Sequence, residues 1–214
     1  MSLISIEQDY CKVKRWDIIN YIATKITNPA YLEIGTSIGE NYYKIKINNK
    51  ECCDPIKREG INYTYTMNSD DAFVKIKQQN KKYDIIFIDG LHCKNQVHSD
   101  IKNALSCLNK NGYILIHDCN PPTYLHERYP HENFPEHFNS PWNGNVYQSF
   151  IKFKLENPTI FTRVIDTDWG IGIIQPDINE INENICLMDK LIETENDIIV
   201  GGVINIENKY INWE

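Results

Sequence analysis

Hydrophobic positions along the chain switch repeatedly between the spacing of a helix and that of a strand. In residues 15–27, RWDIINYIATKIT, apolar side chains recur every three or four positions, which predicts a helix with one buried face. Residues 161–176, FTRVIDTDWGIGIIQP, predict two strands joined by a tight turn at 166–168. Five further runs predict strands. One begins at Tyr31 (YLEIG), one ends at Asp54, and three cover 61–67 (INYTYTM), 83–88 (YDIIFI) and 113–119 (YILIHDC).

Helical patterns separate most of these strands. They cover about 38–46, a segment with Ser69 as its N-cap, a segment from about Lys94 that stops at Asn111-Gly112, and 144–155 (GNVYQSFIKFKL). Strands that alternate with crossover helices form βαβ units, so the sheet should be mostly parallel and covered on both faces. The predicted fold class is therefore α/β: a Rossmann-like, doubly wound sheet of seven strands with a C-terminal antiparallel hairpin at one edge.

The length of 214 residues is enough for one domain with a full-sized core. We expect this domain to span residues 1–176, followed by a C-terminal extension, 177–214, which is a candidate assembly arm for a homo-oligomer. Residues 120–145 hold five of the nine prolines and show no sustained period. Such a long irregular segment is typical of a lid or substrate loop.

Composition narrows the range of partners. The net charge is -7, from 22 basic and 29 acidic residues, and no long basic run is present, which disfavours nucleic acid as a partner. No apolar run reaches membrane length and the first residues lack the apolar core of a signal peptide, so we expect a soluble, cytoplasmic protein without a membrane partner. Seven cysteines without a C-x-x-C pair fit reduced thiols in that compartment.

Polar residues follow five predicted strands at the point where each strand stops. Ligands of such sheets bind in the crevice at the carboxyl ends of the strands, so residues far apart in the sequence should meet there. The set consists of Glu33, Gly35, Thr36 and Gly39 after the first strand, Asp54 after the second, Ser69 and Asp70 after the third, Asp89 and His92 after the fourth, and His117 and Asp118 after the fifth.

The first of these turns, EIGTSIGEN, contains Gly35 and Gly39 in a G-x-x-x-G spacing. Glycines at this place let the backbone approach a ligand closely, although the same pair also occurs in ordinary strand-to-helix turns. Ser37 stands where the dinucleotide fingerprint has its middle glycine, which argues against a bound pyrophosphate. An anionic Glu33 at the mouth would instead suit a cationic group such as an α-ammonium.

The series EIGTSIG, CCDP, NSDDAF, YDIIFIDGLH and GYILIHDCNPP resembles the class I S-adenosylmethionine-dependent methyltransferases over about residues 30–175. More narrowly, it is similar to small-molecule O-methyltransferases related to the macrolide-sugar O-methyltransferases. The resemblance implies that Glu33, Gly35, Thr36 and Gly39 surround the methionine part of the cofactor, that Asp54 accepts both ribose hydroxyls, that Ser69 and Asp70 lie beside the adenine, and that Asp89 lies near the sulfonium.

His92 is the predicted general base. Transfer of a methyl group from a sulfonium to an alcohol requires removal of the hydroxyl proton. His92 lies three residues beyond Asp89, where related metal-assisted catechol-type methyltransferases carry a lysine base, and an imidazole can accept a proton at neutral pH. His117 is the substitute candidate, and the competing interpretation is that His92 only caps the helix that begins near Lys94.

Asp89 and Asp118, at neighbouring strand ends, are candidate ligands of Mg²⁺, which would bind the substrate oxygen and lower its pKa. The chain departs here from the catechol-type pattern, in which Asn directly follows the second acid. Cys119 intervenes and the amide is Asn120. The alternative is that Asp118 orients a histidine or binds the substrate.

The 120–145 loop carries His126, His131 and His137, whose spacing matches no helical face and disfavours a three-histidine metal cluster. The same loop is rich in aromatic residues, among them Trp142, and aromatic side chains of a lid can stack on a sugar while excluding water. The favoured acceptor is therefore a hydroxyl of a small polar molecule such as a sugar, a sugar nucleotide or a glycan precursor.

Two other functions compete with methyl transfer. A nicotinamide-dependent sugar oxidoreductase would need a Tyr-x-x-x-Lys pair, which Tyr42 and Lys46 supply, but in the helix after the glycine turn rather than over a nicotinamide. The second alternative is a non-catalytic binding protein that keeps the Rossmann-like fold. The acids at positions 33, 54 and 89 argue against loss of the cofactor site.

Overall fold

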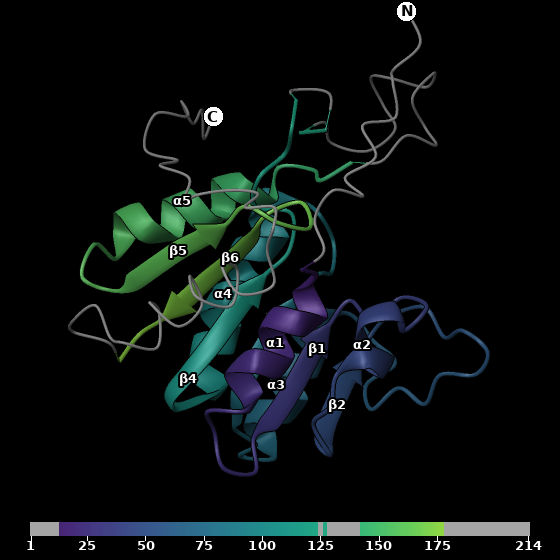
Figure 1. Cartoon of the computed structure of the whole chain (residues 1–214). Coiled ribbons are helices and arrows are strands. Elements are labelled where there is room, and N and C mark those ends of the chain that lie inside the picture. The colour runs from purple at the N-terminus through teal and green to yellow at the C-terminus, as the bar shows by residue number, and fades with distance from the viewer. Residues whose placement is uncertain (1–12, 124–125, 128–141, 178–214) are drawn as a thin grey trace, which may run out of the picture.

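Six strands form one sheet in the part of the chain that the computed structural model describes, residues 13–123, 126–127 and 142–177 (Figure 1). The strands are β1 (Ala30–Ile34), β2 (Asn49–Cys53), β3 (Tyr83–Ile88), β4 (Leu108–Ile116), β5 (Phe161–Ile165) and β6 (Ile171–Gln175). The helices are α1 (Arg15–Ala23), α2 (Glu40–Lys44), α3 (Ser69–Gln78), α4 (Lys94–Cys107) and α5 (Val146–Glu156).

The strand order in the sheet is β2-β1-β3-β4-β6-β5. β1 pairs in parallel with β2 and β3, and β3 pairs in parallel with β4, so the predicted parallel arrangement is confirmed for these four strands. β6 runs antiparallel to β4 and to β5 at the other edge. Because the four parallel strands point the same way, the loops that follow them meet at one edge of the sheet.

The prediction of seven strands is wrong for the described residues, because 61–67 form no strand. Only Tyr65 makes a β-bridge, in parallel with Cys53 of the edge strand β2. Next to this bridge, the Cys52 N–H donates to the Thr64 hydroxyl at 3.2 Å rather than to a backbone carbonyl. A side-chain acceptor has replaced one step of the hydrogen-bond ladder, and the segment continues as a loop.

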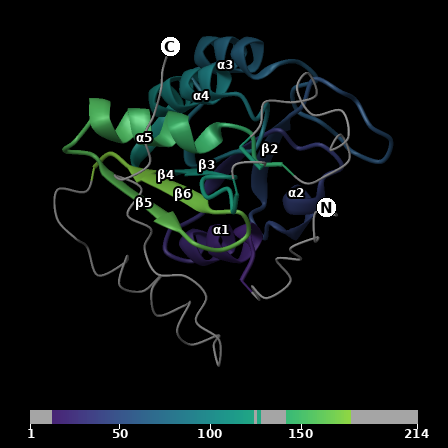
Figure 2. The same cartoon turned by 90° about the horizontal axis from the view of Figure 1, so that it is seen from above.

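Helices cover both faces of the sheet, as the view from above shows (Figure 2). α3, α4 and α5 lie on one face, where Phe73, Ile101 and Phe150 belong to one buried cluster. α1 lies on the other face, where Ile18 and Ile22 are buried with residues of the sheet. Burial of a large aliphatic or aromatic side chain contributes about 1.5–3 kcal/mol, so both layers hold the strand ends in place.

Three predicted helix boundaries are wrong. α1 ends at Ala23, short of the predicted 15–27. The N-cap of α3 is Asn68 rather than Ser69, because the Asn68 side chain accepts the N–H of Asp71 at 2.8 Å. α4 ends at Cys107 rather than at Asn111-Gly112, because Leu108 already has extended backbone angles and pairs with Tyr83. The predicted buried face of α4 is confirmed for Val97, Ile101 and Ala104.

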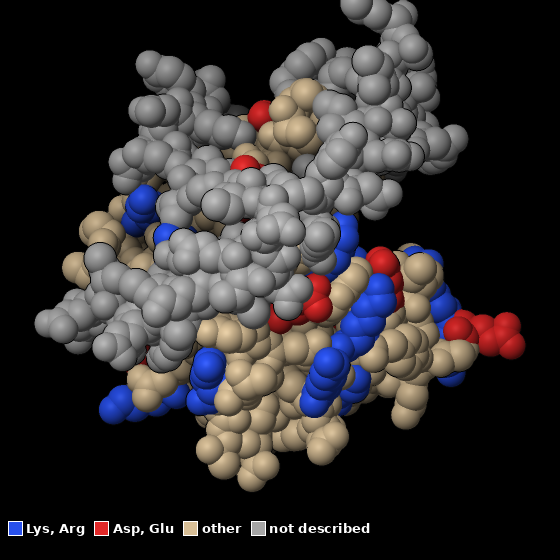
Figure 3. Space-filling view, in the orientation of Figure 1, with Lys and Arg blue, Asp and Glu red and all other residues tan. Residues whose placement is uncertain are grey.

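All of the predicted extension 177–214 except Asp177, and most of the 120–145 loop, including His131 and His137, lie outside the described residues. Within the described ranges, no helix has both the length and the apolar character needed to cross a membrane. Figure 3 shows Lys and Arg side chains interspersed with Asp and Glu on one face. Among the ion pairs of the described residues, Glu40 pairs with Arg15 and with Lys44.

Candidate active site

A pocket of about 710 Å³ lies at the carboxyl ends of the parallel strands, where the sequence predicts the site. This volume is within the usual range for small-molecule sites. Of the predicted site residues, Gly39 and Asp70 are not part of its lining. The predicted residues that line it are Glu33, Gly35, Thr36, Asp54, Ser69, Asp89, His92, His117 and Asp118.

Gly35 allows the ends of β1 and β3 to come close together. It has a φ of +87°, and a Cβ atom at this position would lie 2.0 Å from the Asp89 carbonyl oxygen. A side chain here would therefore push Asp89 out of place. Gly39, also at positive φ, is the N-cap of the short helix α2, and a Cβ atom there would lie 2.6 Å from the Tyr43 ring.

Glu33 is buried below the pocket surface rather than standing free at its mouth. It is 1% exposed, and its Oε2 accepts hydrogen bonds from the Tyr31 hydroxyl at 2.6 Å and the Asn41 amide at 2.7 Å. Burial raises the pKa of Glu33 to about 7, while these two hydrogen bonds act to lower it. The anionic charge predicted for this position is therefore not fixed at neutral pH.

Asp54 connects the turn that follows β1 to the turn that follows β2. Its Oδ2 accepts the Ser37 N–H at 2.7 Å and its Oδ1 accepts the Ile56 N–H at 2.8 Å. Each carboxylate oxygen has a second lone pair, so these contacts leave acceptor capacity for a ligand. Thr36, which follows Gly35, is almost fully buried. Its hydroxyl donates to the Cys53 carbonyl at 3.4 Å.

Four predicted catalytic residues gather at the ends of β3 and β4. Asp89 Oδ1 lies 3.2 Å from His117 Nδ1 and 3.4 Å from His92 Nε2. Asp118 Oδ2 lies 3.1 Å from His117 Nδ1 and 3.3 Å from His92 Nδ1. The two imidazoles therefore lie between two carboxylates.

This arrangement changes the proton affinity of each group. Burial raises the pKa of Asp89, but the charges of His117 and His92 outweigh it and hold that pKa below its ordinary range. Burial lowers the pKa of His92, but its hydrogen bond to Asp89 and the charge of Asp118 raise it above its usual value. The pKa of His117 is raised further, because Asp118 and Asp89 together outweigh the effect of its burial.

Residues 142–145 (WNGN), which we call the WNGN segment, hold His92 and Asp118. The Trp142 ring lies 4.8 Å from the His92 ring, centroid to centroid, and the Asn145 N–H donates to the His92 carbonyl at 3.3 Å. Asn143, fully buried, donates from Nδ2 to Asp118 Oδ1 at 2.7 Å.

The helix cap suggested for His92 is supplied by another residue. The Lys94 N–H donates to the Asn145 side chain at 2.6 Å, and the residue at the N-cap position is Cys93. The competing interpretation of His92 as the cap of α4 is therefore wrong, and its imidazole lies among the acids of the pocket.

Sequence reasoning missed the amide beside Asp118. Asn120, considered from its place after Asp118 and Cys119, donates instead to Asp166 at 2.8 Å. The neighbouring amide is Asn143, 25 positions from Asp118. No local spacing rule would have found it.

Arg15, at the start of α1, also lines the pocket and was missed. Its guanidinium donates to Asp168 Oδ2 at 2.9 Å and to Glu40 Oε2 at 3.1 Å. Burial lowers the pKa of Arg15, but the charges of Asp89 and Asp168 outweigh it and raise that pKa. Arg15 therefore brings a fixed positive charge to a pocket rich in carboxylates.

Asp89, His92 and Asp118 are able to hold a cation. One ligand atom from each lies within 4.8 Å of the others. His92 Nδ1 and Asp118 Oδ2 are buried and lie 3.3 Å apart, but neither atom meets hydrogen-bond geometry within the described residues, so a cation bound between them would contact both. Two carboxylates with one imidazole fit a divalent ion, although the nitrogen ligand makes the set less specific for Mg²⁺ than oxygen ligands alone.

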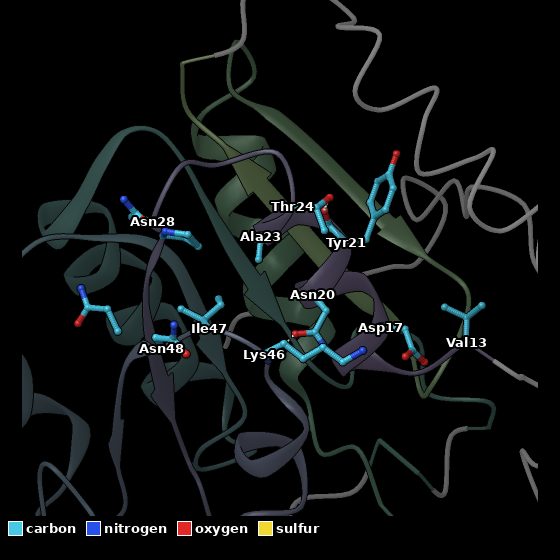
Figure 4. Close-up of a pocket in the computed structure, with 12 residues that line it drawn as sticks. Val13, Asp17, Asn20, Tyr21, Ala23, Thr24, Asn28, Lys46, Ile47 and Asn48 are labelled. Atoms are coloured by element: carbon cyan, nitrogen blue, oxygen red, sulfur yellow. Dashed lines mark hydrogen bonds between the residues drawn. The ribbon is translucent and has the colours of Figure 1, made fainter.

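A second cleft, of about 800 Å³, lies beside α1 and the loops before β1 and β2 (Figure 4). Its lining is mostly uncharged, and Asp17 there accepts the Lys14 N–H at 3.0 Å. Lys46 lines this cleft, whereas the Tyr42 hydroxyl donates to the Lys50 carbonyl at 3.0 Å. The Tyr42–Lys46 pair is therefore absent from the lining of the strand-end pocket, which removes the motif on which an oxidoreductase would depend.

Comparison with protein families gives one match, to a family described as a methyltransferase domain, over residues 32–119. This segment runs from β1 through the loop after β4 and contains most of the residues of the strand-end pocket. No curated protein matches the chain significantly.

Solved structures share the fold at low sequence identity. A Staphylococcus aureus protein, whose name proposes caffeoyl-CoA O-methyltransferase activity, has a TM-score of 0.51 and 17% identity, with 82% of this chain and 93% of that chain covered. An O-methyltransferase from Bacillus cereus, solved with S-adenosylhomocysteine, has a TM-score of 0.49 and 13% identity, with 78% and 86% covered. MycE, a methyltransferase of the mycinamycin biosynthetic pathway solved with Mg, S-adenosylhomocysteine and mycinamycin VI, has a TM-score of 0.47 and 15% identity, with 72% and 46% covered.

Residues 32–119 therefore resemble a methyltransferase domain, and the chain has a Rossmann-like fold. The family match supports the methyl transfer that the sequence predicts. The chain spans about half the length of MycE.

Proposed function

We propose that this enzyme transfers the methyl group of S-adenosylmethionine to a hydroxyl of a small polar molecule. The observation that carries the proposal is the group of Asp89, His92, His117 and Asp118 at one pocket with the glycine turn and Asp54. A cofactor in that pocket would have its ribose at Asp54 and its adenine at Ser69. The sulfonium would then lie near Asp89.

His92 is the general base in this proposal. The side chain of His92 is 22% exposed, whereas the side chain of His117 is 9% exposed. A substrate hydroxyl therefore reaches His92 more readily, and His117 serves to hold Asp89 and Asp118 in place. Because two carboxylates raise the pKa of His92, it accepts the proton best once the pH exceeds that raised value.

A divalent cation is the second part of the proposal, with Asp89 and Asp118 as its ligands and His92 as an alternative third ligand. Such an ion would act as a Lewis acid on the acceptor oxygen. The two roles of His92 are mutually exclusive, because a nitrogen bound to a cation cannot accept a proton. Activity that survives thorough treatment with a strong chelator would remove the metal and keep His92 as the base.

The acceptor is a sugar or a similar polyhydroxy molecule in this proposal. Trp142 and Trp169 both line the pocket, and indole faces stack well on sugar rings. The side chains of Glu40 and Arg58, also in the lining, offer charged hydrogen-bonding groups.

A screen of sugars and sugar nucleotides with isotopically labelled S-adenosylmethionine tests the proposal. We expect label in a product that keeps its methyl group under conditions that cleave methyl esters, because an ether is stable there. Label in a nitrogen or carbon position would contradict O-methylation. Transfer only to aromatic hydroxyls would contradict the sugar acceptor and leave the O-methyltransferase activity.

A further inference from the structure

Gln96, in the first turn of α4, lines the pocket beside Ser69. Its amide nitrogen Nε2 faces three acceptors: Ser69 Oγ at 3.1 Å, Asp100 Oδ1 at 3.1 Å and Asp70 Oδ1 at 3.3 Å. Carboxylates only accept hydrogen bonds, so these neighbours determine which end of the amide faces them. Half a turn of the amide would bring its oxygen against two carboxylates.

The other end of this amide is available to a ligand. Within the described ranges, Gln96 Oε1 accepts no hydrogen bond. The atom is not buried either, so a ligand can reach it. Since the nitrogen is held by α3 and by Asp100, the carbonyl oxygen is the polar group that Gln96 can present to the pocket. The side chain thus offers one acceptor in a fixed orientation.

Asp100, which accepts a hydrogen bond from Gln96 Nε2, helps to fix this orientation of the amide. Its side chain is 1% exposed and it lies one helical turn after Gln96. Burial raises the pKa of Asp100 to about 6, while hydrogen bonds from Ser69 and Gln96 act to lower it. The carboxylate is therefore ionised at pH 7.5, where it can only accept. Asp70, predicted to lie beside the adenine, accepts a hydrogen bond from Gln96 and is not part of the pocket lining.

We propose that Gln96 reads the 6-amino group of the cofactor's adenine through Oε1 and so determines which purine the site accepts. This inference rests on the proposed function, which puts the adenine beside Ser69. The 6-amino group of adenine donates hydrogen bonds, whereas the 6-oxo group of hypoxanthine would meet Oε1 oxygen to oxygen. A polar group that is left without its partner in a site rejects the analogue more strongly than a lost apolar contact does.

The test compares the binding of S-adenosylhomocysteine and S-inosylhomocysteine by calorimetry at pH 7.5. The full-length wild-type protein should bind the adenosine compound roughly 10- to 100-fold more tightly. Gln96→Met keeps the length of the side chain without its carbonyl and should bring the two affinities within about threefold of each other. Gln96→Ala is the second variant, in case Met packs poorly, and Asn95→Ala, an exposed neighbour on the same helix, is the matched control that should keep the wild-type ratio.

Each result has a distinct meaning. A wild-type protein that binds both compounds equally, or a Gln96 variant that keeps the full preference, would overturn the role of Gln96 and leave the cofactor assignment intact. A wild-type protein that binds neither compound would overturn the proposed function itself. Loss of the preference in both Gln96 variants, with a normal ratio in Asn95→Ala, is the expected outcome.

Discussion

His92 lies between two carboxylates, and its proposed role as the general base can be tested directly by substitution. Replacement by alanine removes the proton acceptor, and we expect kcat to fall by roughly 10²–10⁴-fold, the usual contribution of a general base. The affinity for S-adenosylhomocysteine should change little, because the cofactor contacts assigned to Asp54 and Ser69 remain. Steady-state kinetics and calorimetry on the same preparation measure both quantities.

The matched control is His98→Gln, which changes a histidine of α4 that pairs with Glu156 and is not part of the pocket lining. This variant should keep the wild-type kcat. If His92→Ala retains full activity, the general-base role is wrong. If it loses cofactor affinity as much as turnover, the side chain acts in binding.

Asp118 provides a second test at the residue scale, through pH. Its charge helps to raise the pKa of His92, so protonated His92 persists to higher pH than an unperturbed imidazole would. Asp118→Asn removes that charge, and the acid limb of the kcat/KM profile should move to lower pH. An unchanged limb, at whatever absolute rate, would show that the titrating group is not controlled by Asp118.

At the scale of elements, the WNGN segment connects α5 to the loop that carries His92. Gly144 has a φ of +64°, and a Cβ there would lie 2.1 Å from the His92 carbonyl oxygen. Gly144→Ala should therefore destabilise the fold by more than the roughly 1–2 kcal/mol that left-handed backbone costs a non-glycine residue. It should also lower kcat, because His92 must move.

Gly60→Ala separates the two causes. Gly60 has a φ of +80° with no atom within 4 Å of the added Cβ, so it tests the backbone cost alone. Denaturant unfolding should place Gly60→Ala between the wild type and Gly144→Ala, with normal kcat for Gly60→Ala. Equal stability and equal activity of the two variants would contradict the close contact between Gly144 and His92.

The spacing of apolar residues along the sequence predicted the elements that bury one regular face or a continuous apolar run. The buried runs at β1, β3 and β4 and the apolar face of α4 follow directly from side-chain spacing. The convergence of Asp54, Asp89 and Asp118 follows from one rule, that parallel strands end at the same edge. The segment 61–67 failed because alternation cannot show that Thr64 would replace a backbone acceptor.

The missed residues share long sequence separations. Arg15 reaches Asp168 across 153 positions, and Asn143 reaches Asp118 across 25. Gln96 reaches Ser69 across 27 positions, from a helix whose apolar face drew attention to other residues. Such contacts depend on how α1, α4 and the WNGN segment pack, which no local period encodes.

At the scale of the whole molecule, the pocket proposed for the cofactor joins the ends of β1, β2, β3 and β4, so ligand binding there should stabilise the entire fold. At 100 times its Kd, S-adenosylhomocysteine should add about 2.7 kcal/mol, or roughly 5–11 °C in Tm for a chain of this size, whereas NAD should add nothing.

Asp54→Ala should lose most of this shift, because the ribose loses its carboxylate partner. Asp84→Ala is the matched control: Asp84 likewise accepts hydrogen bonds from the Ala30 N–H and the Asn109 amide, both at 2.8 Å, but it is not part of the pocket lining. Both variants should unfold earlier than the wild type without ligand, so the comparison is made on the shift measured by calorimetry at equal ligand concentration. A full shift in Asp54→Ala would remove the ribose role, and a shift with NAD in place of S-adenosylhomocysteine would contradict the cofactor itself.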